Sequence, residues 1–133
     1  MIYVIGGDVG ELLDLNYFIP AFKEKIIKFL ENGGIYIGES AESIILADDC
    51  TYLYDVEQSA NSPKPKYWKK HPSNKGLGLT SYNIIPHYEA VSEELKKAIA
   101  EYNGVNITTL NDGEFIITSY RNVNHGKPTE TER

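Results

Sequence analysis

Continuous apolar runs alternate with amphipathic segments along the first third of the chain. Residues 2–5 form an apolar run that ends at two glycines, which is typical of a strand buried on both faces of a parallel sheet. Over 19–30, apolar residues recur at helical spacing, and an Asn-Gly-Gly sequence at 32–34 ends the predicted helix. A second apolar run at 35–37 leads into a serine turn, and residues 43–47 are compatible with a helix. This order of strand, helix, strand and helix predicts an open parallel sheet.

The rest of the chain carries shorter patterns of the same kinds. Residues 50–54 are predicted to form a short strand, and the apolar run at 82–86 predicts another. Apolar residues at helical spacing predict a helix over 91–102, which an Asn-Gly pair ends. Residues 105–110 and 114–119 are predicted as strands on either side of an Asn-Asp-Gly sequence, which is a strong hairpin signal.

Two segments depart from this pattern. Residues 58–78 are rich in Ser, Asn, Pro and Gly and carry lysines, which predicts a long and locally basic loop. Residues 122–133 are polar and are predicted to form a disordered tail. The chain is therefore expected to form a single domain over residues 1–121.

Composition and charge are ordinary for a globular protein and disfavour several classes of function. The chain has 133 residues, a net charge of −6 and a pI near 5.0, so no nucleic acid or anionic membrane is expected as a partner. No apolar stretch approaches the roughly 20 residues of a membrane span. The sequence carries no phosphate-binding glycine motif and no Cys/His cluster with metal-ligand spacing, so no cofactor is expected. The single cysteine, Cys50, and the lack of a signal segment favour a cytoplasmic location.

A serine at a strand-to-helix turn is the strongest chemical signal. Ser40 follows an apolar run, with Gly38 two residues before it and a helix-compatible run after it. Such a turn holds a hydroxyl out of the sheet, beside the backbone N–H groups of a helix start, as nucleophilic hydrolases do. The alternative is that Ser40 only caps the following helix, because serine is a preferred N-cap residue. Glu42 replaces the last glycine of the usual G-x-S-x-G pattern.

His87 is the candidate general base for this serine. It follows an apolar run, and side chains at the carboxyl ends of neighbouring parallel strands can converge. A histidine base works best when a carboxylate fixes its tautomer. Asp55 and Glu57 are the candidates for that carboxylate, and the sequence does not choose between them.

Three segments together resemble the peptidase E (aspartyl dipeptidase) family of serine peptidases. These segments are Ile2 to Asp8, Ile35 to Ala41, and Leu79 to Tyr88 with its Ile-Pro-His-Tyr sequence. The resemblance covers roughly residues 1–120 and implies a class I glutamine amidotransferase-like fold. We therefore expect a three-layer α/β sandwich with a mainly parallel, flavodoxin-like sheet. The chain resembles the second half of a family member, so the N-terminal strands of that fold are expected to be missing.

The resemblance also implies the site and its activity. The implied activity is hydrolysis of small peptides with N-terminal aspartate through an acyl-enzyme, without metal or organic cofactor. Apart from the resemblance, the local positive charge of the basic loop predicts that it covers the site and attracts an acidic substrate. The resemblance implies Ser40 as the nucleophile and His87 as the general base. It implies Asp55 as the acid, with Glu57 as the alternative. The implied oxyanion donors are the backbone N–H groups of Gly7 and Ala41.

Three departures from the family pattern support a second hypothesis. Asp8 stands where the family has asparagine, and Glu42 where it has glycine. The missing half would leave a sheet edge and apolar helix faces exposed, unless the chain forms a homodimer or pairs with a separately encoded half. The alternative function is therefore a catalytically inactive, truncated peptidase E-like remnant or assembly module.

Overall fold

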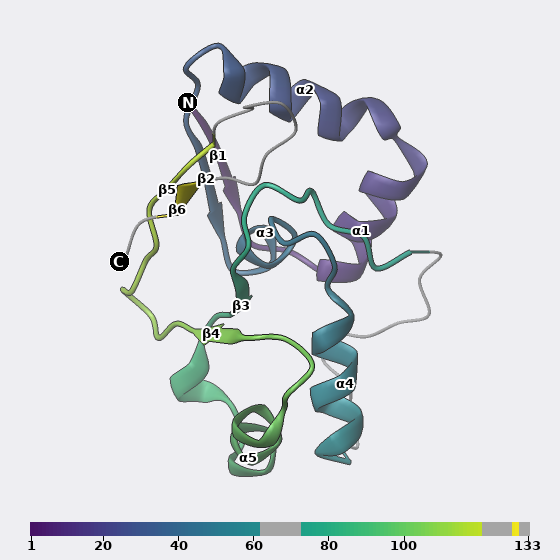
Figure 1. The fold of residues 1–133 in the computed structure, drawn as a ribbon, viewed down its shortest axis with the longest axis vertical. Coiled ribbons are helices and arrows are strands. Elements are labelled where there is room, and N and C mark those ends of the chain that lie inside the picture. The colour runs from purple at the N-terminus through teal and green to yellow at the C-terminus, as the bar shows by residue number, and fades with distance from the viewer. Residues whose placement is uncertain (62–72, 121–128, 131–133) are drawn as a thin grey trace.

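Two pairs of parallel strands carry the fold of the computed structural model, which describes residues 1–61, 73–120 and 129–130 (Figure 1). β1 (Ile2–Ile5) pairs with β2 (Tyr36–Glu39), and Ile5 lies opposite Glu39. β3 (Asn83–Ile85) pairs with β4 (Ile107–Thr109) in the same parallel sense. The predicted α/β class with parallel strands is confirmed. Among the described strands these pairs are separate, and together they do not form one continuous ladder.

Two helices connect β1 to β2, and Figure 1 shows both on the same side of that strand pair. α2 (Pro20–Glu31) matches the amphipathic pattern predicted over 19–30. α1 (Val9–Phe18) was not predicted. Its N-terminus is fixed by Asp8, whose carboxylate accepts a hydrogen bond from the backbone N–H of Glu11 at 3.1 Å.

Two helices follow the serine turn along the chain. α3 (Ala41–Ile44) is short, and α4 (Thr51–Ser59) replaces the strand predicted at 50–54. The strand prediction is wrong. The aromatic and β-branched residues at 50–54 have strand propensity, but the positions that are buried recur at helical spacing. The buried face of α4 comprises Tyr52, Leu53, Val56 and Glu57.

The C-terminal third forms a helix as predicted but not the predicted hairpin. The short 3₁₀ helix η1 (Tyr88–Ala90) precedes α5 (Glu93–Glu101), which agrees with the helix predicted over 91–102. β4 pairs with β3, while β5 (Thr118–Ser119) pairs in antiparallel fashion with β6 (Thr129–Glu130). The two strands on either side of the Asn-Asp-Gly sequence, β4 and β5, therefore do not pair with each other. β6 lies within the tail predicted to be disordered, and the rest of that tail lies outside the described residues.

The hydrophobic core lies between the helices and the inner face of the strands. Its most deeply buried apolar side chains belong to Leu13, Ile44, Leu53, Leu77 and Ile85, each at most 1% exposed. Tyr52 crosses this core, and its hydroxyl donates a hydrogen bond to the carbonyl oxygen of Ile84 at 2.7 Å. This bond matters because a buried hydroxyl without a hydrogen-bond partner would destabilise the fold.

The other face of the β1–β2 pair is apolar and exposed. Along both strands the side chains alternate between half-buried and exposed positions. Tyr3, Ile5, Ile35 and Ile37 are among the exposed large apolar side chains. The expectation of a homodimer or of a separate partner half that would cover a sheet edge and apolar helix faces stays a prediction. Among the residues that the structure describes, no helix combines the length and apolar character needed to cross a membrane.

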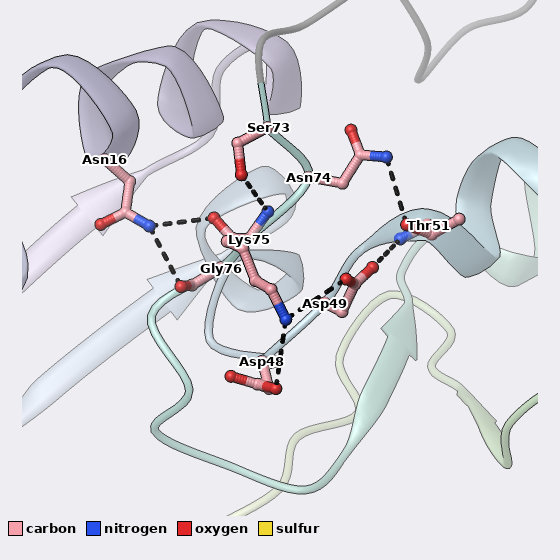
Figure 2. A network of polar contacts seen from close by, with 8 residues as sticks. All are labelled: Asn16, Asp48, Asp49, Thr51, Ser73, Asn74, Lys75 and Gly76. Atoms are coloured by element: carbon pink, nitrogen blue, oxygen red, sulfur yellow. Dashed lines mark hydrogen bonds and ion pairs between the residues drawn. The ribbon is translucent and has the colours of Figure 1, made fainter.

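The described end of the predicted basic loop is bound to the segment between α3 and α4 (Figure 2). Asn16 donates from its amide nitrogen to the carbonyl oxygens of Lys75 and Gly76, at 2.9 and 3.0 Å. The ammonium of Lys75 lies 3.8 Å from Asp48 and 3.6 Å from Asp49. A methyl group added at Gly76 would lie 2.0 Å from the carbonyl oxygen of Ala47, so only glycine fits there. The other lysines of the loop, with residues 62–72, lie outside the described residues.

Candidate active site

Ser40 occupies a strained turn between β2 and α3. Its φ of 56° and ψ of −117° place it in a region that side chains rarely adopt, at a cost of roughly 1–3 kcal/mol. The surrounding hydrogen bonds fix this conformation, since the carbonyl oxygen of Ser40 accepts from the hydroxyl of Ser43 at 2.6 Å and from its N–H at 3.1 Å. The turn therefore has the sharp geometry predicted from the sequence, in which the hydroxyl leaves the strand end.

Gly38 allows the chain to make this turn. A methyl group added at Gly38 would lie 2.7 Å from the carbonyl oxygen of Glu42 and 2.8 Å from its carbonyl carbon. Both are backbone atoms, so they cannot move away without displacing α3. The structure thus gives a steric reason for the glycine two residues before the serine.

The hydroxyl of Ser40 contacts His87 and does not cap α3. Its side chain makes no capping hydrogen bond, and Nε2 of His87 lies 3.1 Å from Ser40 Oγ. His87 follows β3 in a left-handed conformation, with φ 54° and ψ 37°. Because α3 contacts both β2 and β3, the carboxyl ends of these two strands are brought together. The predicted convergence of the two side chains is what the structure shows.

Asp112 completes a chain of hydrogen bonds behind His87. Its Oδ1 lies 2.5 Å from Nδ1 of His87, the ring nitrogen that faces away from Ser40. The backbone N–H of Asp112 in turn donates to the carboxylate of Glu89 at 3.0 Å. Ser40, His87 and Asp112 therefore have the order of contacts of a nucleophile, base and acid.

Asp55 and Glu57, the predicted acids, lie elsewhere. Both belong to α4, which packs against α5. The carboxylate of Asp55 accepts a hydrogen bond from the hydroxyl of Tyr102 at 2.9 Å, and Glu57 is buried in the core at 2% exposure. The segment expected to be a strand is a helix, so these carboxylates are not at the end of a strand beside His87. The structure brings Asp112 to His87 in their place.

A sequence signal for Asp112 was present but was interpreted as a hairpin turn. Asp112 follows the apolar run at 105–110, and it lies just beyond the carboxyl end of β4. The backbone continues the β3–β4 pairing as far as the bond from the N–H of Tyr88 to the carbonyl of Leu110, at 3.0 Å. A prediction of parallel pairing between β3 and β4 would have placed Asp112 and His87 at the same edge of the sheet, because each residue follows the carboxyl end of its strand.

The predicted oxyanion donors lie close to the serine turn. Ala41 begins α3, so its backbone N–H has no acceptor one helical turn earlier. Gly7 lies near the side chain of Glu42, because a methyl group added at Gly7 would be 3.7 Å from Glu42 Oε1. Glu42 is 3% exposed, and its Oε2 has no hydrogen-bond partner among the described residues. Asp8 is directed to the N-terminus of α1, as its capping bond shows.

A cavity of about 690 Å³ opens beside this set of side chains. It is lined by residues from β1 and β2, the end of β3 and the segment 110–118, and it includes Ser40, His87 and Asp112. We call it the Ser40 groove. A volume of this size accommodates a small peptide.

Other reactive groups are remote from this chemistry. Burial raises the pKa of the Cys50 thiol to about 12, and its Sγ lies 3.6 Å from the carbonyl oxygen of Ile44. The thiol is therefore protonated at neutral pH and is a poor nucleophile. Burial, with the nearby Glu42 carboxylate, also raises the pKa of Tyr36 to about 12. Within residues 1–61 and 73–120, no group of His, Cys, Asp and Glu side chains has the arrangement of a metal site.

Comparison with known protein families identifies the family of the chain. The model of Peptidase family S51 matches residues 1–125, which is most of the chain. The chain belongs to Peptidase family S51. The resemblance drawn from the three sequence segments is thereby confirmed, and the S51 match includes the serine turn, the His87 strand and the Asp112 turn.

Two similar proteins come from Listeria. A protein of Listeria innocua described as "Uncharacterized peptidase Lin0382" is 31% identical over 103 residues, which are 76% of this chain and 46% of the relative. A crystal structure from Listeria monocytogenes EGD-e, provisionally described as a peptidase E protein, superimposes with a TM-score of 0.62 and 27% identity. That match covers 87% of this chain and 54% of the other. The chain thus spans about half the length of the relatives it matches.

Proposed function

We propose that this S51 chain is a serine-type hydrolase of small peptides that works through an acyl-enzyme. The observation that carries the proposal is the continuous line of contacts from Ser40 Oγ to His87 Nε2, and from His87 Nδ1 to Asp112 Oδ1. The strained turn and the adjoining groove support it, because they expose the hydroxyl and leave room for a substrate.

Each side chain then has a defined task. Nε2 of His87 accepts the proton of Ser40 as the hydroxyl oxygen attacks the peptide carbonyl carbon, and later gives that proton to the leaving amine. Asp112 accepts the hydrogen bond of Nδ1–H, which keeps Nε2 unprotonated in the resting state and stabilises the imidazolium. Water then attacks the acyl-enzyme with His87 again as base, and the acid product leaves.

The oxyanion that forms on the attacked carbonyl needs hydrogen-bond donors. We assign this task to the backbone N–H groups of Gly7 and Ala41, which flank the serine turn. Asp8 is compatible with this assignment, because its carboxylate is used as the N-cap of α1 and is directed to Glu11. One such donor is typically worth about 10²–10³ in rate.

The resemblance further predicts a preference for N-terminal aspartate, which stays a prediction. Recognition of an aspartyl side chain requires a cationic group facing the substrate. The described lining residues of the Ser40 groove include no lysine or arginine. Lys75, the one described lysine of the predicted basic loop, is paired with Asp48 and Asp49.

One observation favours the second candidate function, a protein that kept the fold and lost turnover. The carboxyl group of Glu42 is buried next to Gly7, with one oxygen lacking a described hydrogen-bond partner. A negative charge at that position would oppose a developing oxyanion. An assembly module without catalysis is therefore the alternative.

Labelling with a fluorophosphonate separates the two functions. We expect stoichiometric modification of the wild-type chain at Ser40, located by mass spectrometry of the digested protein. His87→Ala should slow labelling about 10²-fold or more, because the hydroxyl then lacks its base.

Matched controls make the result specific. Ser59→Ala removes a hydroxyl from an exposed position at the end of α4, outside the groove lining, and should leave both the site and the rate of modification unchanged. Circular dichroism confirms that each variant is folded. A folded wild-type chain that does not react with the reagent would reject the hydrolase proposal and favour the inactive module.

A further inference from the structure

Glu42 carries a buried carboxyl group that the candidate triad does not use. It is the second residue of α3, two positions after Ser40, and it is 3% exposed. Because α3 contacts α1, β2 and β3, this short helix is packed between several elements of the fold. Burial of a carboxylate is costly unless a cation or hydrogen bonds compensate the charge. A glutamate at this position therefore needs a physical explanation.

The described residues give this carboxyl group little compensation. Its Oε2 atom is buried without a hydrogen-bond partner among them, and none of their lysine, arginine or histidine side chains forms an ion pair with it. Burial, together with the Glu42 carboxylate, raises the pKa of Tyr36 to about 12, so a second group of the interior is affected by the same charge. Glu42 thus brings negative charge into the interior next to the serine turn.

The Glu42 carboxyl group is close to both backbone groups assigned to the oxyanion. Ala41 directly precedes Glu42 in α3, and a methyl group added at Gly7 would lie 3.7 Å from Glu42 Oε1. Since a Cβ atom lies about 2.5 Å from the nitrogen of its own residue, Oε1 is within roughly 6 Å of the Gly7 nitrogen. The oxyanion would bind to the N–H group on this nitrogen.

A negative charge at this separation affects the tetrahedral state more than the bound peptide. The attacked carbonyl oxygen gains negative charge only as Ser40 adds to the carbonyl carbon. Repulsion between two unit charges about 7 Å apart, at an effective dielectric constant of about 20, corresponds to a loss in rate of about 10- to 100-fold. Such a loss slows a hydrolase without dismantling its triad.

We propose that Glu42 slows the acylation of Ser40 by opposing the oxyanion, so that neutralising this one side chain makes the chain more active. The inference rests on the proposed hydrolase function and adds the residue that limits its rate. Because the effect acts on the tetrahedral state, it changes kcat and leaves the KM of a peptide near its wild-type value. A merely structural role for Glu42 predicts the opposite sign, since its replacement would then lower activity.

Glu42→Gln tests the inference, because it removes the charge and keeps the size of the side chain. We expect the maximal rate of fluorophosphonate labelling at Ser40 to rise about tenfold or more, with little change in the reagent concentration that gives half of that rate. Glu42→Met is a second neutral variant of similar size, without a polar atom to bury, and it should accelerate labelling similarly. Circular dichroism and urea denaturation establish that each variant is folded.

Two further variants show whether charge at this position causes the increase. Glu42→Asp retains the negative charge, so labelling should stay within about threefold of the wild-type rate. Glu57→Gln makes the same chemical change at another buried glutamate, which is 2% exposed, belongs to α4 and lies outside the groove lining. It should also leave the rate within about threefold. An equal acceleration in Glu57→Gln would trace the gain to loosening of the core and would contradict the inference.

The outcomes separate this inference from the proposed function. If the wild-type chain is labelled at Ser40 but neither neutral variant is faster, the role of Glu42 is wrong and the hydrolase proposal stands. If only the neutral variants are labelled, the inference stands and the hydrolase proposal fails for the wild-type chain. Folded variants that all remain unlabelled would overturn both. Failure of both neutral variants to fold would assign Glu42 a structural role and would also overturn the inference.

Discussion

Replacement of Asp112 by asparagine should lower kcat of peptide hydrolysis by about 10³-fold, with little change in the fold. Asp112 Oδ1 lies 2.5 Å from His87 Nδ1, so the carboxylate fixes the tautomer in which Nε2 can accept a proton from Ser40. An asparagine amide can donate to Nδ1, which would place the ring proton on Nε2 and direct it at the serine. Steady-state kinetics with a fluorogenic dipeptide, or the rate of fluorophosphonate labelling, measures the loss.

Asp55→Asn is the matched control for this prediction. It makes the same chemical change at the position that the family resemblance implied, where the carboxylate contacts Tyr102 and not His87. We expect kcat within about threefold of wild type, because the site does not use this carboxylate. A loss in Asp55→Asn equal to that in Asp112→Asn, in folded protein, would show that the carboxylate that supports His87 is assigned wrongly.

Gly38→Ala should disrupt the serine turn and destabilise the chain. The added methyl group would lie 2.7 Å from the backbone carbonyl oxygen of Glu42, which cannot move aside as the end of a flexible side chain could. Overpacking of this kind typically costs about 1–3 kcal/mol of unfolding free energy. A displacement of Ser40 by roughly 1 Å would also lower the rate of labelling by about 10²-fold. Urea denaturation and labelling kinetics measure the two effects.

Gly7→Ala controls for the stability part of this prediction. A methyl group at Gly7 would make only an ordinary contact, 3.7 Å from Glu42 Oε1, and the backbone N–H is retained. Its unfolding free energy should therefore remain within about 1 kcal/mol of wild type. If Gly38→Ala were as stable and as reactive as wild type, the turn would not depend on glycine at that position.

The local sequence was sufficient for part of the site. Ser40 was predicted because a short apolar run, a glycine and a helix-compatible segment surround it, and this pattern specifies the turn by local sterics. His87 was predicted from its place after an apolar run. Their contact at 3.1 Å depends on α3, which contacts both β2 and β3 and so brings together the carboxyl ends of two strands that do not pair with each other.

Tertiary structure decided the identity of the carboxylate. Asp112 lies 25 residues after His87, in a sequence whose local preference is for a hairpin turn. Local preference was overridden because β4 pairs with β3, and this long-range pairing carries the 111–114 turn to the histidine. Asp55 was misplaced for the converse reason, since burial of one face of α4 outweighed the strand propensity of residues 50–54.

The sequence by itself determined the α/β class, the amphipathic helices α2 and α5, the serine turn and the family resemblance, because each depends on spacing within a short window. Only the tertiary structure decided which carboxylate supports His87, where Glu42 is buried, and which charges surround the Ser40 groove. These features depend on contacts between segments far apart in the chain, such as Tyr3 with Glu39 and His87 with Asp112. Strand pairing and core packing set such contacts, and no local pattern encodes them.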